Sequence, residues 1–276
     1  SPERHSCPGR PVQRAARRRI IRLRDKISMS NSAKNYDHHF YSDLERTSRP
    51  SAQLIIPRVQ ELCTVQSVVD VGCGAGWWLN VCRENGIEDI FGIDGNWIAD
   101  DQVELPKDRF LRRELESTYD LDRQFDLAIC MEVAEHLSAD SAPCLIAELC
   151  KLAPIVLFSA AVPHQEGPGH INEQWPSYWA KKFADQGYST IDSLRLPIWN
   201  EETVAWWYRQ NMVLYASEAA LAANPKLSEA ASLSPKTPLN LVHPGMHQEI
   251  IRRGNAPWRI IMSRRVRQSV RNWFDR

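Results

Sequence analysis

The stretch VVDVGCGAGWW, residues 68–78, decides the fold. Its first half is a short apolar run that predicts a buried strand, and its second half opens a helix. Between them lie Gly72, Gly74 and Gly76. Glycines at such a turn let the chain bend tightly and admit a ligand against the main chain, and the first N–H groups of the helix favour negative charge. The pattern therefore predicts a ligand-binding turn between a strand and a helix.

From residue 68 onward the rest of the chain has the periodicity of alternating strands and helices. Several short runs are apolar throughout, which suits parallel strands that are covered on both faces. The predicted strands are 67–72, 89–94, 109–114, 125–131, 154–160, one near 188–194, and 211–217. The predicted helices are 77–85, one near Trp97, 141–151, one within 172–187, and 201–210. The order predicts an α/β fold.

The second predicted strand ends in Asp94, 18 residues after Gly76. A carboxylate at that place can hold the two hydroxyls of a ribose. The glycine spacing is G-x-G-x-G, with Asp70 two residues before the first glycine, whereas dinucleotide dehydrogenases favour G-x-G-x-x-G. In these features the sequence resembles the class I S-adenosylmethionine (SAM)-dependent methyltransferases, over about residues 36–217.

This resemblance implies a Rossmann-like fold with helices on both faces of a seven-stranded, mostly parallel sheet, whose last strand, 211–217, is antiparallel. It implies a methyltransferase that uses SAM. It also implies the cofactor contacts: the methionine part of SAM lies beside Asp70, Gly72, Gly74 and Gly76, its ribose on Asp94, its adenine near Gly95, Trp97 and Leu115, and its floor on Met131 and Glu132.

A second motif, CMEVAEHL at residues 130–137, follows the fourth predicted strand. A helix that starts at about Val133 would place Glu132, Glu135 and His136 on one face at the mouth of the sheet. The run resembles the metal site of the ubiquinone-pathway O-methyltransferases and of the small-RNA 3′-terminal 2′-O-methyltransferases. In that resemblance a later histidine completes the site; here it is His170, with His164 as a substitute.

Two carboxylates and two imidazoles, from Glu132, Glu135, His136 and His170, suit Mg²⁺, Mn²⁺ or Zn²⁺. Such an ion would favour the deprotonated form of a substrate oxygen. Two alternatives stay open. His136 or His170 acts as a general base without metal, or the four residues have structural roles only.

The acceptor that these residues favour is an oxygen of a small, partly apolar molecule, since a base or a metal helps most where a proton must leave. Trp175, Tyr178 and Trp179 would add apolar surface, although aromatics at helical spacing are usually core. Two other hypotheses stay open: a metal-dependent 2′-O-methyltransferase of RNA ends, and a catalytically silent SAM-binding or membrane-surface module. The acidic middle of the chain makes a nucleic-acid substrate the weaker expectation.

Composition is that of a globular protein: 43% of the 276 residues are hydrophobic and 25% are charged. No apolar run is long enough to span a membrane. Seven cysteines without a C-x-x-C pair favour a reducing, cytoplasmic compartment over a disulfide scaffold or a zinc finger.

The net charge of zero hides two basic ends. Residues 1–28 hold nine Arg or Lys against two acids, and residues 249–276 hold eight Arg against two acids. We expect three parts: a disordered basic extension over 1–28, the methyltransferase domain over 29–217, and a linker with a basic amphipathic helix over 218–276. That last helix either lies on an anionic membrane or docks on the domain.

Overall fold

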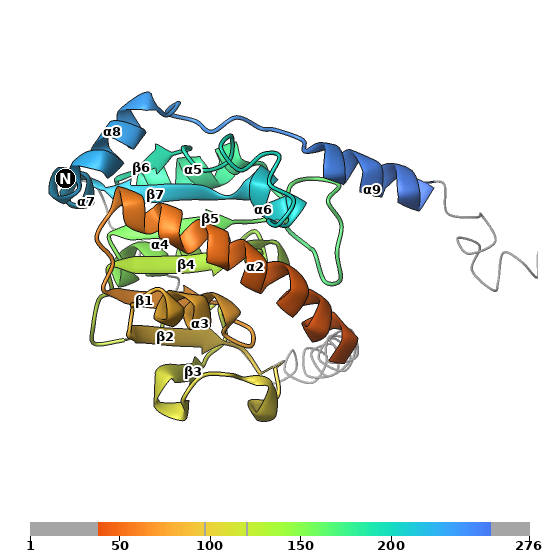
Figure 1. Cartoon of the computed structure of the whole chain (residues 1–276), viewed down its shortest axis with the longest axis horizontal. Helices are drawn as coiled ribbons and strands as arrows, with labels where there is room; N and C mark the ends of the chain where they lie inside the picture. Colours follow the sequence, from red (N-terminus) through yellow and green to blue (C-terminus); the bar gives the residue numbers. More distant parts are fainter. Residues whose placement is uncertain (1–37, 97, 120, 255–276) are drawn as a thin grey trace, which may run out of the picture. The chain divides into compact units, whose positions relative to one another are not determined.

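The computed structural model describes residues 38–96, 98–119 and 121–254. Its core is a seven-stranded sheet in the order β3-β2-β1-β4-β5-β7-β6 (Figure 1). β7 runs antiparallel to its neighbours β5 and β6, and all other pairs are parallel. The strands are β1 Ser67–Val71, β2 Asp89–Asp94, β3 Phe110–Arg112, β4 Leu127–Met131, β5 Ile155–Ser159, β6 Tyr188–Ile191 and β7 Val213–Ser217. The predicted fold class is confirmed.

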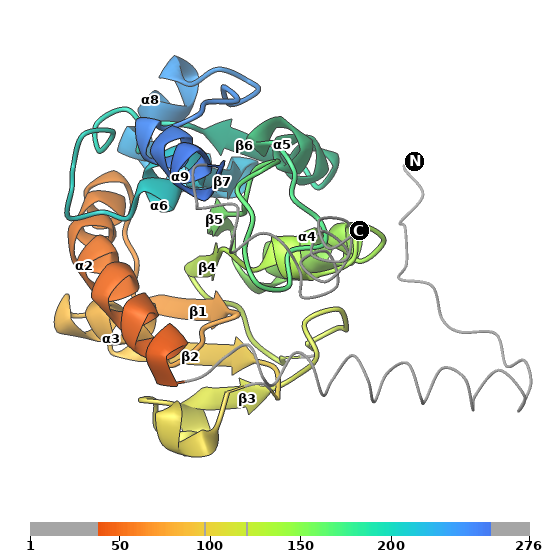
Figure 2. The same cartoon turned by 90° about the vertical axis from the view of Figure 1, so that its right-hand side faces the viewer.

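Helices cover both faces of the sheet (Figure 2). One face packs against α2 His38–Leu62, α3 Trp77–Glu84, α6 Trp206–Asn211, α7 Glu218–Ala223 and α8 Pro225–Leu233. The other face packs against α4 Ala142–Leu152 and α5 Pro176–Asp185. No helix in the described part of the chain is long and apolar enough to cross a membrane.

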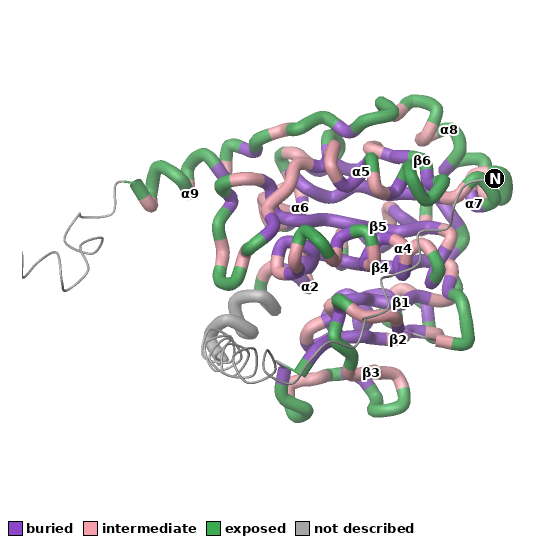
Figure 3. The backbone as a smooth tube through the Cα atoms, turned by 180° about the vertical axis from the view of Figure 1, so that it is seen from behind, coloured by how far each residue is buried: buried purple, intermediate pink, exposed green. Residues whose placement is uncertain are grey.

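The strand β4 explains why these runs are apolar throughout. Leu127, Ile129 and Met131 belong to the core on the α2 and α3 side, whereas Ala128 and Cys130 belong to the core on the α4 and α5 side. Successive side chains of a strand point to opposite faces, so a strand that is covered twice needs apolar residues at every position. Figure 3 accordingly shows most of the sheet as buried, whereas the edge strand β3 is half-buried.

Three segments differ from the sequence-based expectation. The long helix α2 was not predicted, because Pro50 and Pro57 inside it look like breaks in a helical pattern. The helix expected from Val133 is only a 3₁₀ turn, η3 Ala134–His136. The stretch rich in Ala and Ser after β7, expected as a linker, contains the helices α7 and α8.

Three expectations fall partly or wholly outside the described residues. Trp97, near which a helix was expected, is not described, and the next regular element is the 3₁₀ turn η1 Asp100–Gln102. Residues 1–28 and the proposed amphipathic helix beyond residue 254 are likewise outside the described part. Leu241–Arg276 forms a unit of its own, in which α9 Pro244–Gly254 is described.

A buried ion pair lies in the segment after β6, and its arginine is hydrogen-bonded to α6. The guanidinium of Arg195 is fully buried and donates to both carboxylate oxygens of Asp192, with its Nε 2.7 Å from Oδ1. Its Nη1 donates to the backbone carbonyl of Gln210 at 2.9 Å. The charge of Arg195 is therefore balanced inside the protein by that of Asp192, and removal of one partner would leave the other as a buried charge without a partner.

We expect Arg195→Met to lower the free energy of unfolding by about 3–5 kcal/mol, the usual cost of breaking a buried pair from one side. Urea denaturation measures this loss. The control is Lys181→Met, which removes the exposed pair with Asp185 on α5 and should change little. A loss below about 1 kcal/mol for Arg195→Met would mean that Asp192 finds water or another donor.

Candidate functional site

The glycine turn lies at the carboxyl ends of β1 and β2. The N–H groups of Gly72 and Cys73 donate to the carbonyl of Ile93 at 2.8 and 3.2 Å. Gly72 has a φ of 81° and lies so close to Val133 that an added Cβ would stand 2.3 Å from its Cγ2. Gly74 faces open space, since nothing lies within 4 Å of its ideal Cβ position. The turn is closed on one side and open to a ligand on the other.

Asp94, the last residue of β2, lies against this turn. Its carboxylate is buried and accepts the N–H of Gly74 at 2.5 Å and that of Gly95 at 2.6 Å. Asp70, in β1, is also buried, and burial followed by the charge of Asp94 raises its pKa well above the ordinary range. Four of the predicted cofactor residues thus lie together at the carboxyl ends of β1 and β2.

The other predicted cofactor residues flank this edge in different ways. Met131 ends β4 and is buried, and Glu132 follows it directly. Leu115 is buried in the core on the α4 and α5 side. Trp97 lies outside the described residues.

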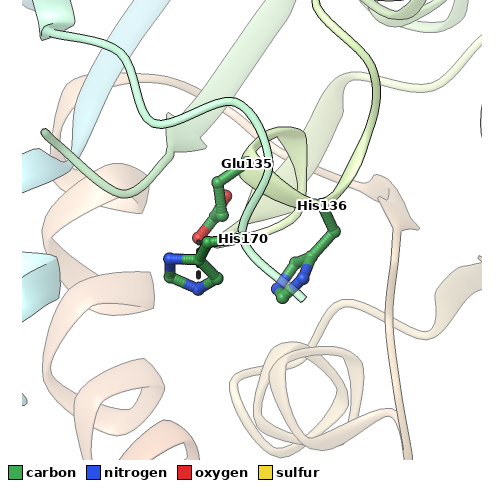
Figure 4. Close-up of side chains that lie close together, drawn as sticks. All are labelled: Glu135, His136 and His170. Atoms are coloured by element: carbon green, nitrogen blue, oxygen red, sulfur yellow. Dashed lines mark ion pairs between the residues drawn. The ribbon is translucent and has the colours of Figure 1, made fainter. Parts of the chain in front are cut away.

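A second cluster forms beside the first from Glu135, His136 and His170 (Figure 4). The first two come from η3, and His170 comes from the loop between β5 and α5. One nitrogen or oxygen atom of each residue lies within 4.8 Å of the other two. The loop is tied to the turn because the N–H groups of Ile171 and Asn172 donate to the carbonyl of Glu135 at 2.8 and 3.0 Å.

Glu135 is buried, His136 and His170 are half-buried, and the cluster is short of hydrogen bonds. Both carboxylate oxygens of Glu135 and Nδ1 of His136 have no hydrogen-bond partner among the described residues. Burial, and after it the charge of Glu132, raises the pKa of Glu135 well above its ordinary range. Burial and the neighbouring His170 lower the pKa of His136 to about 4, against a hydrogen bond with the Gly169 backbone. The imidazole of His136 is therefore neutral at pH 7.

Glu132, the fourth residue of the predicted metal site, has other partners. Its carboxylate accepts the amide N–H of Gln165 at 2.7 Å and that of Asn211 at 3.1 Å. Its φ is 55°, in the left-handed region that non-glycine residues seldom adopt. Burial raises the pKa of Glu132, and these hydrogen bonds act against the rise. The structure brings three of the four residues together and holds the fourth carboxylate beside them.

Sequence reasoning missed Gln165, Asn211 and Glu173. Glu173 accepts a hydrogen bond from the backbone of His164 and lies 2.9 Å from Nδ1 of His170. His164 itself is exposed and is not part of the cluster. No local pattern marks such residues, because their partners are brought together only by the fold.

The sequence profile of a protein family described as "Methyltransferase domain" matches residues 12–211. The chain belongs to this family. It is a SAM-dependent methyltransferase. No curated protein matches the chain.

Several solved structures align with this chain at low sequence identity. DesVI of Streptomyces venezuelae aligns with a TM-score of 0.50 and 12% identity over 66% of this chain and 99% of its own. A SAM-dependent methyltransferase of Archaeoglobus fulgidus has a TM-score of 0.46 and 20% identity, over 66% and 100%. The methyltransferase domain of bacterial CtHen1 has a TM-score of 0.45 and 19% identity, over 60% and 97%.

The glycine turn of this methyltransferase fits SAM on two observations. Gly74 leaves open space where a side chain would stand, and Asp94 is a buried acid next to it. A carboxylate has roughly four acceptor positions, so it can bind loop N–H groups and ribose hydroxyls together. The contacts of the individual residues with SAM stay predictions.

We expect S-adenosylhomocysteine at a hundredfold its Kd to stabilise the protein by about 2.7 kcal/mol, because it binds the native state alone. Asp94→Ala should remove most of the resulting rise in melting temperature. Asp101→Ala, which changes an exposed acid in η1, is the control and should keep the full rise. An unchanged rise in Asp94→Ala would contradict the ribose assignment.

Proposed function

We propose that this methyltransferase transfers the methyl group of SAM to an oxygen atom of a small, partly apolar molecule, with a divalent metal ion held by Glu135, His136 and His170. The observation that carries the proposal is the carboxylate of Glu135. It is fully buried, it has no hydrogen-bond partner among the described residues, and it lies beside two imidazoles.

The donor set fits a divalent cation. A buried carboxylate without partners is costly, and a cation between it and the imidazoles would offset that cost. One carboxylate and two imidazoles suit Mg²⁺, Mn²⁺ or Zn²⁺. Bound there, such an ion would supply positive charge that favours the deprotonated form of an acceptor hydroxyl. His136 is already neutral, which is the form that binds metals.

Residues of the chain supply the rest of the catalysis through positioning. Methyl transfer from a sulfonium needs an acceptor oxygen held in line with the methyl group, and this orientation accounts for most of the acceleration. The Gly72–Val133 contact packs the glycine turn against the segment that leads into η3. The cofactor and the acceptor oxygen would accordingly lie at neighbouring points of the same sheet edge.

An apolar acceptor is supported by Ile171. Its side chain is 69% exposed and follows His170 directly, and its backbone is bonded to Glu135. Trp179, which the sequence also offered, is core, because it is buried against Phe158 with ring centroids 5.3 Å apart. Ile171 is therefore the better candidate for contact with an apolar part of the acceptor.

We expect the protein to bind Mn²⁺ in calorimetry and Glu135→Gln to weaken that binding by more than about 100-fold, since loss of an outer partner alone usually costs 10–100-fold. His164→Asn is the matched control: it removes an imidazole of the same loop outside the cluster, and Asn tolerates the φ of 69° at that position. Absence of Mn²⁺, Mg²⁺ and Zn²⁺ binding would refute the metal site and leave His136 or His170 as a base.

The acceptor class can be tested by release of S-adenosylhomocysteine with a panel of phenols, catechols and aromatic amines. We expect turnover with the hydroxyl compounds and a fall in turnover with a chelator. Short RNA duplexes serve as the comparison. Methylation of RNA alone would support the 2′-O-methyltransferase alternative, and methylation of amines alone would contradict the choice of oxygen.

A further inference from the structure

Glu173 lies near the end of the loop between β5 and α5, and its carboxylate contacts three other residues of this loop. Its Oε1 accepts the N–H of Glu166 at 2.6 Å, and its Oε2 accepts the N–H of His164 at 2.8 Å. Nδ1 of His170 lies 2.9 Å from the same Oε1. One carboxylate thus gathers two backbone groups and an imidazole from three positions of the loop.

This arrangement decides which nitrogen of His170 carries the proton. Both carboxylate oxygens of Glu173 already accept backbone N–H groups, so the oxygen that Nδ1 of His170 meets is an acceptor. Nδ1 of His170 must therefore donate. In a neutral imidazole the lone pair then lies on Nε2.

Nε2 of His170 is the atom that faces the cluster. It lies 4.0 Å from Oε1 of Glu135 (Figure 4). Gly167 lies against this same end of the ring, where an added Cβ would stand 2.3 Å from Nε2. Glu173 fixes one nitrogen of the ring, and the absence of a side chain at Gly167 leaves room for the other.

We propose that Glu173 is a positioning residue, which holds His170 as the Nδ1–H tautomer and presents its unprotonated Nε2 toward Glu135 as a ligand or proton acceptor. The expected effect of Glu173 on metal affinity rests on the proposed function. The assignment of the His170 tautomer does not depend on a metal, so the tautomer and the metal site can be refuted separately.

The tautomer is read from the ¹⁵N shifts of labelled histidine in the metal-free protein at about pH 8, above the ordinary histidine pKa of about 6.5. His170→Asn identifies the resonances. We expect Nδ1–H in the wild type and loss of that preference in Glu173→Gln, whose amide can donate as well as accept. Nε2–H in the wild type, or an unchanged tautomer in Glu173→Gln, would overturn the proposal.

Calorimetry with Mn²⁺ tests the consequence. Glu173→Gln should weaken binding about 10–100-fold, as loss of an outer-sphere carboxylate usually does. Glu166→Gln, which changes another acid of the loop but keeps its backbone N–H, is the control and should bind like the wild type. Equal affinity in Glu173→Gln would overturn the positioning role while the metal site stands.

The variant Gly167→Ala tests the position of the His170 ring separately from its tautomer. Its Cβ would displace the tip of the His170 ring, yet Glu173 stays in place. We expect an unchanged tautomer, an unchanged melting temperature without metal, and Mn²⁺ affinity at least about tenfold weaker. If Gly167→Ala binds Mn²⁺ with full affinity, Nε2 of His170 does not bind the ion at the position that the structure gives it. If the wild type binds no metal, the metal role fails and the tautomer experiment alone judges the role of Glu173.

Discussion

The contact between Gly72 and Val133 is the constraint on which both halves of the site depend. No side chain larger than hydrogen fits at Gly72, because Val133 occupies the position of a Cβ, and the φ of 81° independently favours glycine there. The glycine turn after β1 therefore packs directly on the segment that leads into η3. Since Glu135 and His136 follow within three residues, their distance from the cofactor turn is set by this contact.

Several carboxyl groups are buried at the carboxyl ends of the strands, and their burial lowers the stability of the fold. Asp70, Glu132 and Glu135 all have raised pKa values, in each case chiefly through burial. Structural carboxylates are usually paired, as Asp192 is with Arg195. Several buried acids that gather at the carboxyl ends of the strands without an Arg or Lys beside them are instead typical of functional sites, where the cost is retained for binding or catalysis.

The sequence was sufficient for the sheet and for the glycine turn, because both follow from short-range patterns. Apolar runs marked the strands, and the spacing from Gly76 to Asp94 anticipated that two strand ends meet. The helix α2 was missed since Pro50 and Pro57 hide its periodicity. Spacing did not anticipate the surroundings of Glu132: the expected helix is a 3₁₀ turn, and amides 33 and 79 residues away bind the carboxylate.

Backbone strain locates the functional edge independently of any motif. Among the described residues, the non-glycine residues with positive φ are Glu132, His164 and Glu166. All three lie in the two segments that carry the cluster, and the last two donate their N–H groups to Glu173. Left-handed conformations of such residues cost free energy and persist where surrounding contacts over-determine them. Glu173 supplies those contacts in the loop, and Ser159 supplies them at Glu132, because its carbonyl and its hydroxyl accept the N–H of Glu132 at 3.0 and 3.2 Å. In the loop, the carboxylate that holds the strained backbone is the same one that contacts the imidazole of His170.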